Sequence, residues 1–167
     1  PGLSRDTQMG PLVSGIQLER VMGFVDRAQG RDQIRVVSGG KRPAALENGY
    51  FIEPTVLADV KSGSEIAQEE VFGPVAAMMP FADEEEALAL ANGTSYGLAA
   101  GVWTNDLRRA HRMVQRLRAG TVWVNTYNMI DVTTPWGGVG ASGIGREHGT
   151  AAIEAFTEIK TGVLSLR

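Results

Sequence analysis

The residues of this chain best suited to chemistry lie in the stretch Glu69-Glu70-Val71-Phe72-Gly73-Pro74, where two carboxylates precede an aromatic ring and a Gly-Pro break. A carboxylate can accept paired hydrogen bonds from ribose hydroxyls, and a planar ring can pack beside a nicotinamide. The stretch is therefore compatible with a nucleotide site. It also fits a solvated helix end followed by an aromatic residue of the core, and composition alone favours this second interpretation.

A glycine motif, Gly138-Val139-Gly140-Ala141-Ser142-Gly143, matches the dinucleotide fingerprint G-x-G-x-x-G letter for letter. That fingerprint works when it directly follows a strand and opens a helix, with an acidic residue about 20 positions later on the ribose. Here the nearest predicted strand ends at Asn125, well upstream, and no acid stands at the required place. The motif is predicted to be a tight loop with exposed backbone.

Aromatic and apolar residues gather around the irregular segment that follows Asn125, namely Trp123, Tyr127, Ile130 and Trp136. Such a set could form the apolar wall of a small-molecule pocket. Core packing explains Trp123 equally well.

The cysteine and histidine content of the chain gives little support to metal or thiol chemistry. The chain has no cysteine, which excludes disulfides, thiolate metal sites and a cysteine nucleophile within these 167 residues. His111 and His148 are isolated and lack the spacing of metal ligands, so no metal is expected. Neither a G-x-S-x-G elbow nor a P-loop is present, and hydrolase and kinase functions lose support.

Composition indicates an ordinary globular protein. Of 167 residues, 43% are hydrophobic and 21% charged, with a net charge of −3 and both signs mixed along the chain. No basic surface for nucleic acid is expected. No apolar run approaches the ~20 residues of a membrane span, so the expected location is cytoplasmic, with no membrane partner.

Periodicity and breakers predict an α/β fold with parallel strands and flanking helices. Segment 126–145 is predicted to be a long functional loop. Helices are predicted at 14–28, 83–93, 105–119 and 147–156, and strands at 34–38, 51–56, 75–81, 98–103, 121–125 and 161–166.

Several motifs in order resemble the aldehyde dehydrogenase superfamily, and the resemblance covers almost the whole chain. The motifs are GPLVS at 11–15, GYFIEPTVL at 49–57, EEVFGPV at 69–75, NGTSYGLAAGVWTND at 92–106, AGTVWVN at 119–125, PWGG at 135–138 and SGIGREHG at 142–149. The resemblance implies an incomplete catalytic domain at 1–156 and an oligomerisation strand at 157–167.

In that family a cysteine thiolate attacks the aldehyde, hydride passes from the thiohemiacetal to NAD or NADP, and a glutamate activates the water that hydrolyses the thioester. The resemblance implies that both residues and the coenzyme domain belong to sequence upstream. The chain thus resembles the carboxy-terminal third of such an enzyme. By itself it is expected to be inactive and to bind no cofactor tightly.

Accessory site residues follow from the same resemblance. Glu70 matches the glutamate that binds the nicotinamide ribose, and Phe72 matches the aromatic residue beside the nicotinamide, which reverses the interpretation from composition. Ile130 and Trp136 match positions that line the aldehyde tunnel. Ile130 departs from the aromatic residue found in many members, which leaves the pocket's preference open.

Further positions have more than one interpretation. Glu147 matches a glutamate proposed to relay protons, although an ion pair with neighbouring Arg146 is the preferred explanation. Arg146, Glu158 and Val163 match the region of subunit contact, where family members build dimers or tetramers by strand addition. Two other functions stay open: a stand-alone dinucleotide-binding module at 138–143, and a non-enzymic self-association module that uses the tail strand.

Overall fold

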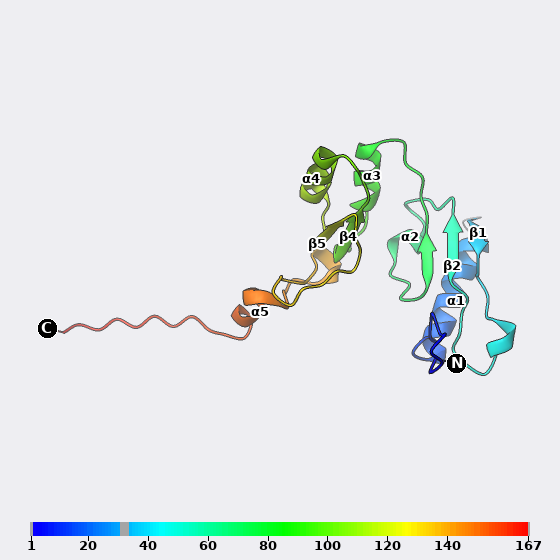
Figure 1. Ribbon diagram of the computed structural model, residues 1–167, viewed down its shortest axis with the longest axis horizontal. Helices are drawn as coiled ribbons and strands as arrows, with labels where there is room; N and C mark the ends of the chain where they lie inside the picture. Colours follow the sequence, from blue (N-terminus) through cyan, green and yellow to red (C-terminus); the bar gives the residue numbers. More distant parts are fainter. Residues whose placement is uncertain (1, 31–33, 167) are drawn as a thin grey trace. The chain divides into compact units, whose positions relative to one another are not determined.

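The computed structural model describes residues 2–30 and 34–166. Positions 1 and 31–33 of the predicted catalytic domain (1–156) and position 167 of the predicted oligomerisation strand (157–167) lie outside the described residues. Its contacts divide the chain into two compact units, Pro1–Asp83 and Glu84–Arg167. Figure 1 shows helices and strands in both units. The predicted α/β fold class is confirmed, and each unit is described by itself.

The first unit is a three-stranded sheet with the order β1-β2-β3, covered by two helices. Strands β1 (Arg35–Ser38) and β2 (Thr55–Ala58) are antiparallel, whereas β2 and β3 (Val75–Ala77) are parallel. The prediction of parallel pairing was therefore wrong for β1. Its connection to β2 holds only the short η1 (Ala44–Leu46) and no crossover helix, which a parallel pair requires.

Helix α1 (Gly15–Gly30) begins as predicted at Ser14, whose hydroxyl oxygen accepts a hydrogen bond of 3.2 Å from the Gln17 backbone N–H. Its apolar face packs with α2 (Glu65–Gln68) and with β2, where Leu57 is fully buried. The core of this side comprises Phe24, Ala28, Ile34, Leu57, Val60 and Ile66.

Two expectations failed here. The strand predicted at 51–56 begins only at Thr55, because Pro54 has no N–H for a ladder. Helix α2 was not predicted at all, since four residues are too few to show a helical period.

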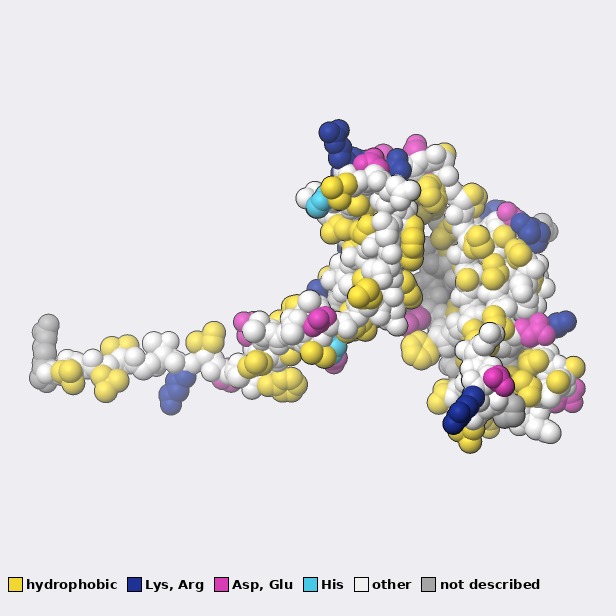
Figure 2. Space-filling view, viewed as in Figure 1, with side chains coloured by type: hydrophobic (Ala, Val, Ile, Leu, Met, Phe, Trp, Pro, Cys, Tyr) yellow, Lys and Arg dark blue, Asp and Glu magenta, His cyan; other side chains and the backbone are white. Residues whose placement is uncertain are grey.

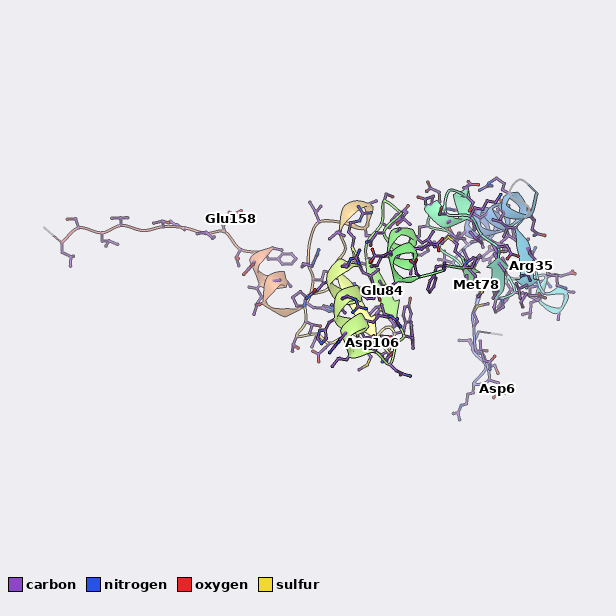
Figure 3. All side chains as sticks on the ribbon, turned by 90° about the horizontal axis from the view of Figure 1, so that it is seen from above. Asp6, Arg35, Met78, Glu84, Asp106 and Glu158 are labelled. Carbon is purple, nitrogen blue, oxygen red and sulfur yellow. The ribbon has the colours of Figure 1, made fainter. Side chains whose placement is uncertain are left out.

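The second unit is built on β4 (Ala99–Val102) and β5 (Thr121–Val124), a parallel pair joined by α4 (Leu107–Arg116). Asp106 caps α4 by accepting hydrogen bonds from the Arg108 and Arg109 backbone N–H groups, and Figure 3 labels it at the start of this helix. Helix α3 (Glu84–Ala91) joins α4 over the pair. Their shared core contains Leu88, Met113 and Leu117, packed against Ala100, Val102 and Val122.

An ion-pair ladder ties α3 to α4. Glu84 accepts hydrogen bonds from Arg109 Nε at 3.1 Å and from Arg112 Nη2 at 2.8 Å, while Glu85 pairs with Arg116. These donors, Arg112 first and Arg109 second, lower the pKa of Glu84 to about 2, against the partial desolvation that would raise it. Figure 3 labels Glu84 at the start of α3.

After β5 the chain forms a long irregular segment, as predicted, with only η2 (Gly140–Ser142) and then α5 (Gly149–Glu154). The helix predicted at 147–156 is therefore shorter. Residues 157–166 form no strand, although one was predicted at 161–166, because a strand requires a hydrogen-bonded neighbour and none of the described residues supplies one. Among the described residues, no helix is long and apolar enough to span a membrane.

Candidate functional site

The stretch from Glu70 to Gly73 is held on α1 by two side chains that reach its backbone. Gln17 Nε2 donates to the carbonyl oxygens of Val71 at 3.1 Å and Phe72 at 2.9 Å. One helical turn later, Arg20 Nη2 donates to the carbonyl oxygen of Glu70 at 2.7 Å. Three consecutive carbonyls are thus fixed by one face of one helix.

Close packing fixes the next residue as well. A Cβ on Gly73 would lie only 2.7 Å from Val21 Cγ2, so a larger residue there would push the stretch off α1. Val21 itself is fully buried. The glycine before Pro74 is therefore required by the approach of this stretch to the helix.

Phe72 combines backbone strain with exposure. Its φ is +56°, in the left-handed region that non-glycine residues rarely adopt, and its side chain is 71% exposed. Strained residues of this kind persist only where surrounding contacts hold them, and they cluster at functional sites. The interpretation of Phe72 as a residue of the core is therefore wrong for this chain, and its exposed ring is accessible to a ligand. The role of Glu70, also exposed, stays a prediction.

In the second unit the predicted aromatic group is brought together around Trp123, which is 8% exposed. Its ring meets Tyr127 edge to face at 5.2 Å between centroids and lies 5.8 Å from the ring of Trp136. Its indole N–H donates to the carbonyl oxygen of Met129 at 2.9 Å. Ile130, next in the chain, is 49% exposed.

The G-x-G-x-x-G motif forms a loop that packs closely against the segment before β4. Among the described residues, β5 ends at Val124, well before the motif, and the motif itself contains only the three-residue η2 and does not open an α-helix, so the stand-alone dinucleotide module loses its structural basis. Gly97 links the motif to β4: its carbonyl accepts from the Val139 N–H at 3.0 Å, and its N–H donates to Ser142 Oγ at 3.0 Å. A Cβ on Gly140 would collide with the Ser95 carbonyl.

Trp136 and Glu147 are paired through their backbones in both directions at 2.7 Å, which closes the loop between them. The expected ion pair between Arg146 and Glu147 is absent from the structure. Arg146 instead donates to the carbonyl oxygens of Gly138 at 2.6 Å and Gly145 at 2.8 Å. Its guanidinium satisfies loop carbonyls, and the Glu147 side chain is exposed.

Glu158 and Val163, predicted at a subunit contact, lie on the extended tail after α5, where Figure 3 labels Glu158. Val163 is 91% exposed and Ile159 99%. Figure 2 shows hydrophobic side chains along this tail. A single chain leaves them uncovered, and the role of the tail in assembly stays a prediction.

Sequence reasoning missed the residues that hold the candidate site. Gln17 and Arg20 occupy the polar side of α1, where solvated residues are expected. Asn125, at the end of β5, has φ +55°, and its side-chain amide exchanges two 2.9 Å hydrogen bonds with the backbone of Thr104. An asparagine at a strand end is the one signal that the sequence offered, since this residue tolerates the left-handed region. No group of three or more His, Asp or Glu residues in the described parts of the chain could hold a metal ion.

Comparison with known proteins agrees with the fold and with these motifs. Residues 1–162 match the model of the Aldehyde dehydrogenase family. The chain is an α/β protein with strained and close-packed loops, and it belongs to the aldehyde dehydrogenase family. The resemblance given by its motifs is thereby confirmed.

Among curated relatives, a betaine aldehyde dehydrogenase of Cereibacter sphaeroides is 51% identical over 159 residues, which are 95% of this chain and 32% of that protein. A betaine aldehyde dehydrogenase of Brucella anthropi is 44% identical over 160 residues, 95% of this chain and 33% of that protein. The chain spans about a third of the length of these relatives.

Solved structures give the same result. The NAD⁺ complex of an aldehyde dehydrogenase from Bacillus cereus is 44% identical, with a TM-score of 0.94 over 98% of this chain and 33% of that one. An aldehyde dehydrogenase of Mycobacterium tuberculosis, also complexed with NAD⁺, is 47% identical with a TM-score of 0.88, over 91% of this chain and 31% of that one.

Proposed function

We propose that this chain supplies the nicotinamide-ribose contact and part of the aldehyde pocket of an enzyme that oxidises an aldehyde to a carboxylic acid with NAD or NADP. The observation that carries the proposal is how the stretch from Glu70 to Phe72 is held. Three of its carbonyls are tied to α1, while the side chains of Glu70 and Phe72 remain exposed. A fixed backbone with free functional side chains is suited to bind a ligand.

Each residue has a defined role in this proposal. The Glu70 carboxylate accepts hydrogen bonds from the two ribose hydroxyls, and the Phe72 ring packs beside the nicotinamide, which limits its rotation. The coenzyme, when bound, accepts hydride from the substrate. Ile130 and Trp136 line the path of the aldehyde. Glu147 is left with no ion pair to Arg146, which keeps its carboxylate available as an accessory proton acceptor.

The nucleophile and the water-activating glutamate of the family are supplied from outside these residues in this proposal, since the chain contains no cysteine. We therefore expect the 167-residue chain alone to show no aldehyde oxidation and no tight NAD binding. Turnover by the isolated chain would contradict the proposal. The same holds for the tail: we propose that Arg146, Glu158 and Val163 belong to a homo-oligomer contact, with 157–167 as its strand.

The betaine aldehyde dehydrogenases among the relatives suggest a substrate with a quaternary ammonium group. Tyr127 and Trp136 supply aromatic faces, and a cation over such a face is stabilised by about 0.5–2 kcal/mol. We propose this substrate class for the pocket. A neutral aldehyde of equal size should then have a KM higher by about two- to thirtyfold, because it lacks the cation.

A hybrid enzyme tests the proposal directly. In the Cereibacter sphaeroides betaine aldehyde dehydrogenase, the matching third is replaced by this chain, and the NAD-dependent oxidation of betaine aldehyde is measured. We expect activity within about tenfold of the parent. A hybrid with the parent's thermal stability and no activity would contradict the proposal.

Two adjacent glutamates provide a matched pair of variants in the hybrid. Glu70→Gln should raise the KM for NAD by about tenfold or more, because the amide has one acceptor oxygen in place of two and loses the charge that strengthens both hydrogen bonds. Glu69→Gln makes the same chemical change one residue earlier and should leave the KM for NAD within about twofold. Equal effects of both variants would show that charge alone, and not a contact of Glu70, determines cofactor affinity.

A further inference from the structure

Trp123 contacts three residues of the irregular segment that follows β5, two of them through their aromatic rings. It is the third residue of β5, and its neighbour Val122 packs against α3 and α4. Successive strand residues point to opposite faces, so the indole lies on the face of β5 away from these helices. With 8% exposure it is the buried member of the aromatic group.

Its contacts bracket the predicted pocket residue Ile130. On one side are the Tyr127 ring at 5.2 Å and the Met129 carbonyl, which accepts the indole N–H at 2.9 Å; on the other is the Trp136 ring at 5.8 Å. The side chains of Tyr127, Met129 and Ile130 are 68%, 70% and 49% exposed. The wall is therefore an exposed, irregular segment with a single buried aromatic anchor among these contacts.

Few other interactions fix this segment. Asp131 accepts hydrogen bonds from the backbone and hydroxyl of Thr133 at 2.8 and 2.6 Å, which shapes a local turn only. The Val132 carbonyl accepts from the Gly149 N–H at 2.9 Å. Between Tyr127 and Ile130 the described hydrogen bond to the rest of the unit is that of the Trp123 indole.

We propose that Trp123 is a positioning residue for aldehyde specificity: it contacts no substrate itself and sets the shape of the wall formed by Ile130 and Trp136. This inference rests on the proposed function. The physical reason is that one rigid side chain on β5 makes a hydrogen bond and two ring contacts with the wall. These contacts fix the position of the wall relative to β5. Loss of the indole N–H leaves the Met129 carbonyl unpaired and frees the wall to shift.

The experiment uses the hybrid enzyme with Trp123→Phe, which retains an aromatic ring and removes the N–H. We expect the KM for betaine aldehyde to rise about five- to tenfold, while the KM for NAD changes less than twofold. Discrimination between short and long aldehydes should weaken, because a mobile wall fits substrates less selectively. A merely structural role would lower stability without this split between the two KM values.

Trp103→Phe is the matched control, since Trp103 directly follows β4, is 64% exposed, and undergoes the identical change. It should leave both KM values unchanged. Should Trp123→Phe fail to fold, replacement of Trp123 by benzothienylalanine removes only the N–H from a ring of the same shape, and the same split is expected. An unchanged aldehyde KM in a folded variant that lacks this N–H overturns the inference.

The outcome separates this inference from the proposed function. If Glu70→Gln raises the KM for NAD and the Trp123 variants leave the aldehyde KM unchanged, the proposed function stands and the role of Trp123 is refuted. If Glu70→Gln has no effect on the KM for NAD, the cofactor contact fails whatever Trp123 does. A parallel rise of both KM values in Trp123→Phe also refutes a role confined to the aldehyde.

Discussion

The side-chain amide of Gln17 donates a hydrogen bond of 2.9 Å to the backbone carbonyl of Phe72, 55 residues later in the chain. The same nitrogen donates to the carbonyl of Val71 at 3.1 Å. One glutamine on the first turn of α1 thus holds the strained residue that the proposed function places beside the nicotinamide. The relationship couples a helix position to cofactor binding, and this coupling can be measured.

Gln17→Glu replaces the donating amide by a carboxylate that faces two carbonyl oxygens. Because neither hydrogen bond can then form and the charges repel, the backbone at Phe72 should relax from its left-handed conformation. In the hybrid enzyme we expect the KM for NAD to rise about fivefold or more. Gln29→Glu, at an exposed position of the same helix, is the control and should keep the parent KM.

The ion-pair ladder between α3 and α4 predicts acid sensitivity. The pKa of Glu84 falls from 4.5 to about 2 on folding, so its contribution to stability is complete above pH 4.5 and is lost as pH falls toward 2. Urea unfolding of the chain between pH 6 and pH 2 should show this loss, and Glu84→Gln should diminish it. Glu154→Gln, on α5 outside the ladder, serves as the control. An identical pH dependence of stability in Glu84→Gln would refute the role of the ladder.

Gly120 has no room for a side chain, since a Cβ would overlap the Gly137 carbonyl. Gly120→Ala must therefore push the glycine-rich loop away from the start of β5 and should lower the free energy of unfolding by about 2–3 kcal/mol. Gly145→Ala is the matched control, because nothing lies within 4 Å of its Cβ position. Chemical denaturation of both variants measures the difference. Similar losses at both positions would contradict the packing argument.

Asn125 continues the β4–β5 ladder with its side chain. Asn125→Asp keeps the oxygen that accepts the Thr104 N–H and removes the donor to the Thr104 carbonyl, at a cost of about 1–2 kcal/mol in the free energy of unfolding. Asn128→Asp is the control: Asn128 also has positive φ, at +58°, but its side chain makes no hydrogen bond to the described residues. It should change stability by less than about 0.5 kcal/mol. Thermal unfolding of the two variants measures the difference in stability, and equal losses would contradict the role of the Asn125 side chain.

The sequence by itself determined the fold class and most elements. Helices such as α1 and α4 carry a regular apolar face and a capping residue, Ser14 or Asp106, and these signals are local. The order of the motifs was sufficient to predict the family. The same local information predicted that the glycine motif is a loop and not a dinucleotide fingerprint, because no predicted strand directly precedes it.

Only the tertiary structure showed the contacts between residues that are separated along the chain. The antiparallel direction of β1, the hydrogen bonds from Gln17 and Arg20 to residues 70–72, and the position of Trp123 between Met129 and Trp136 join residues far apart in the chain. Arg146 likewise bonds loop carbonyls and not its neighbour Glu147. Hydrophobic period and capping report only on residues within a few positions of one another, so contacts of this range exist only once the chain has packed.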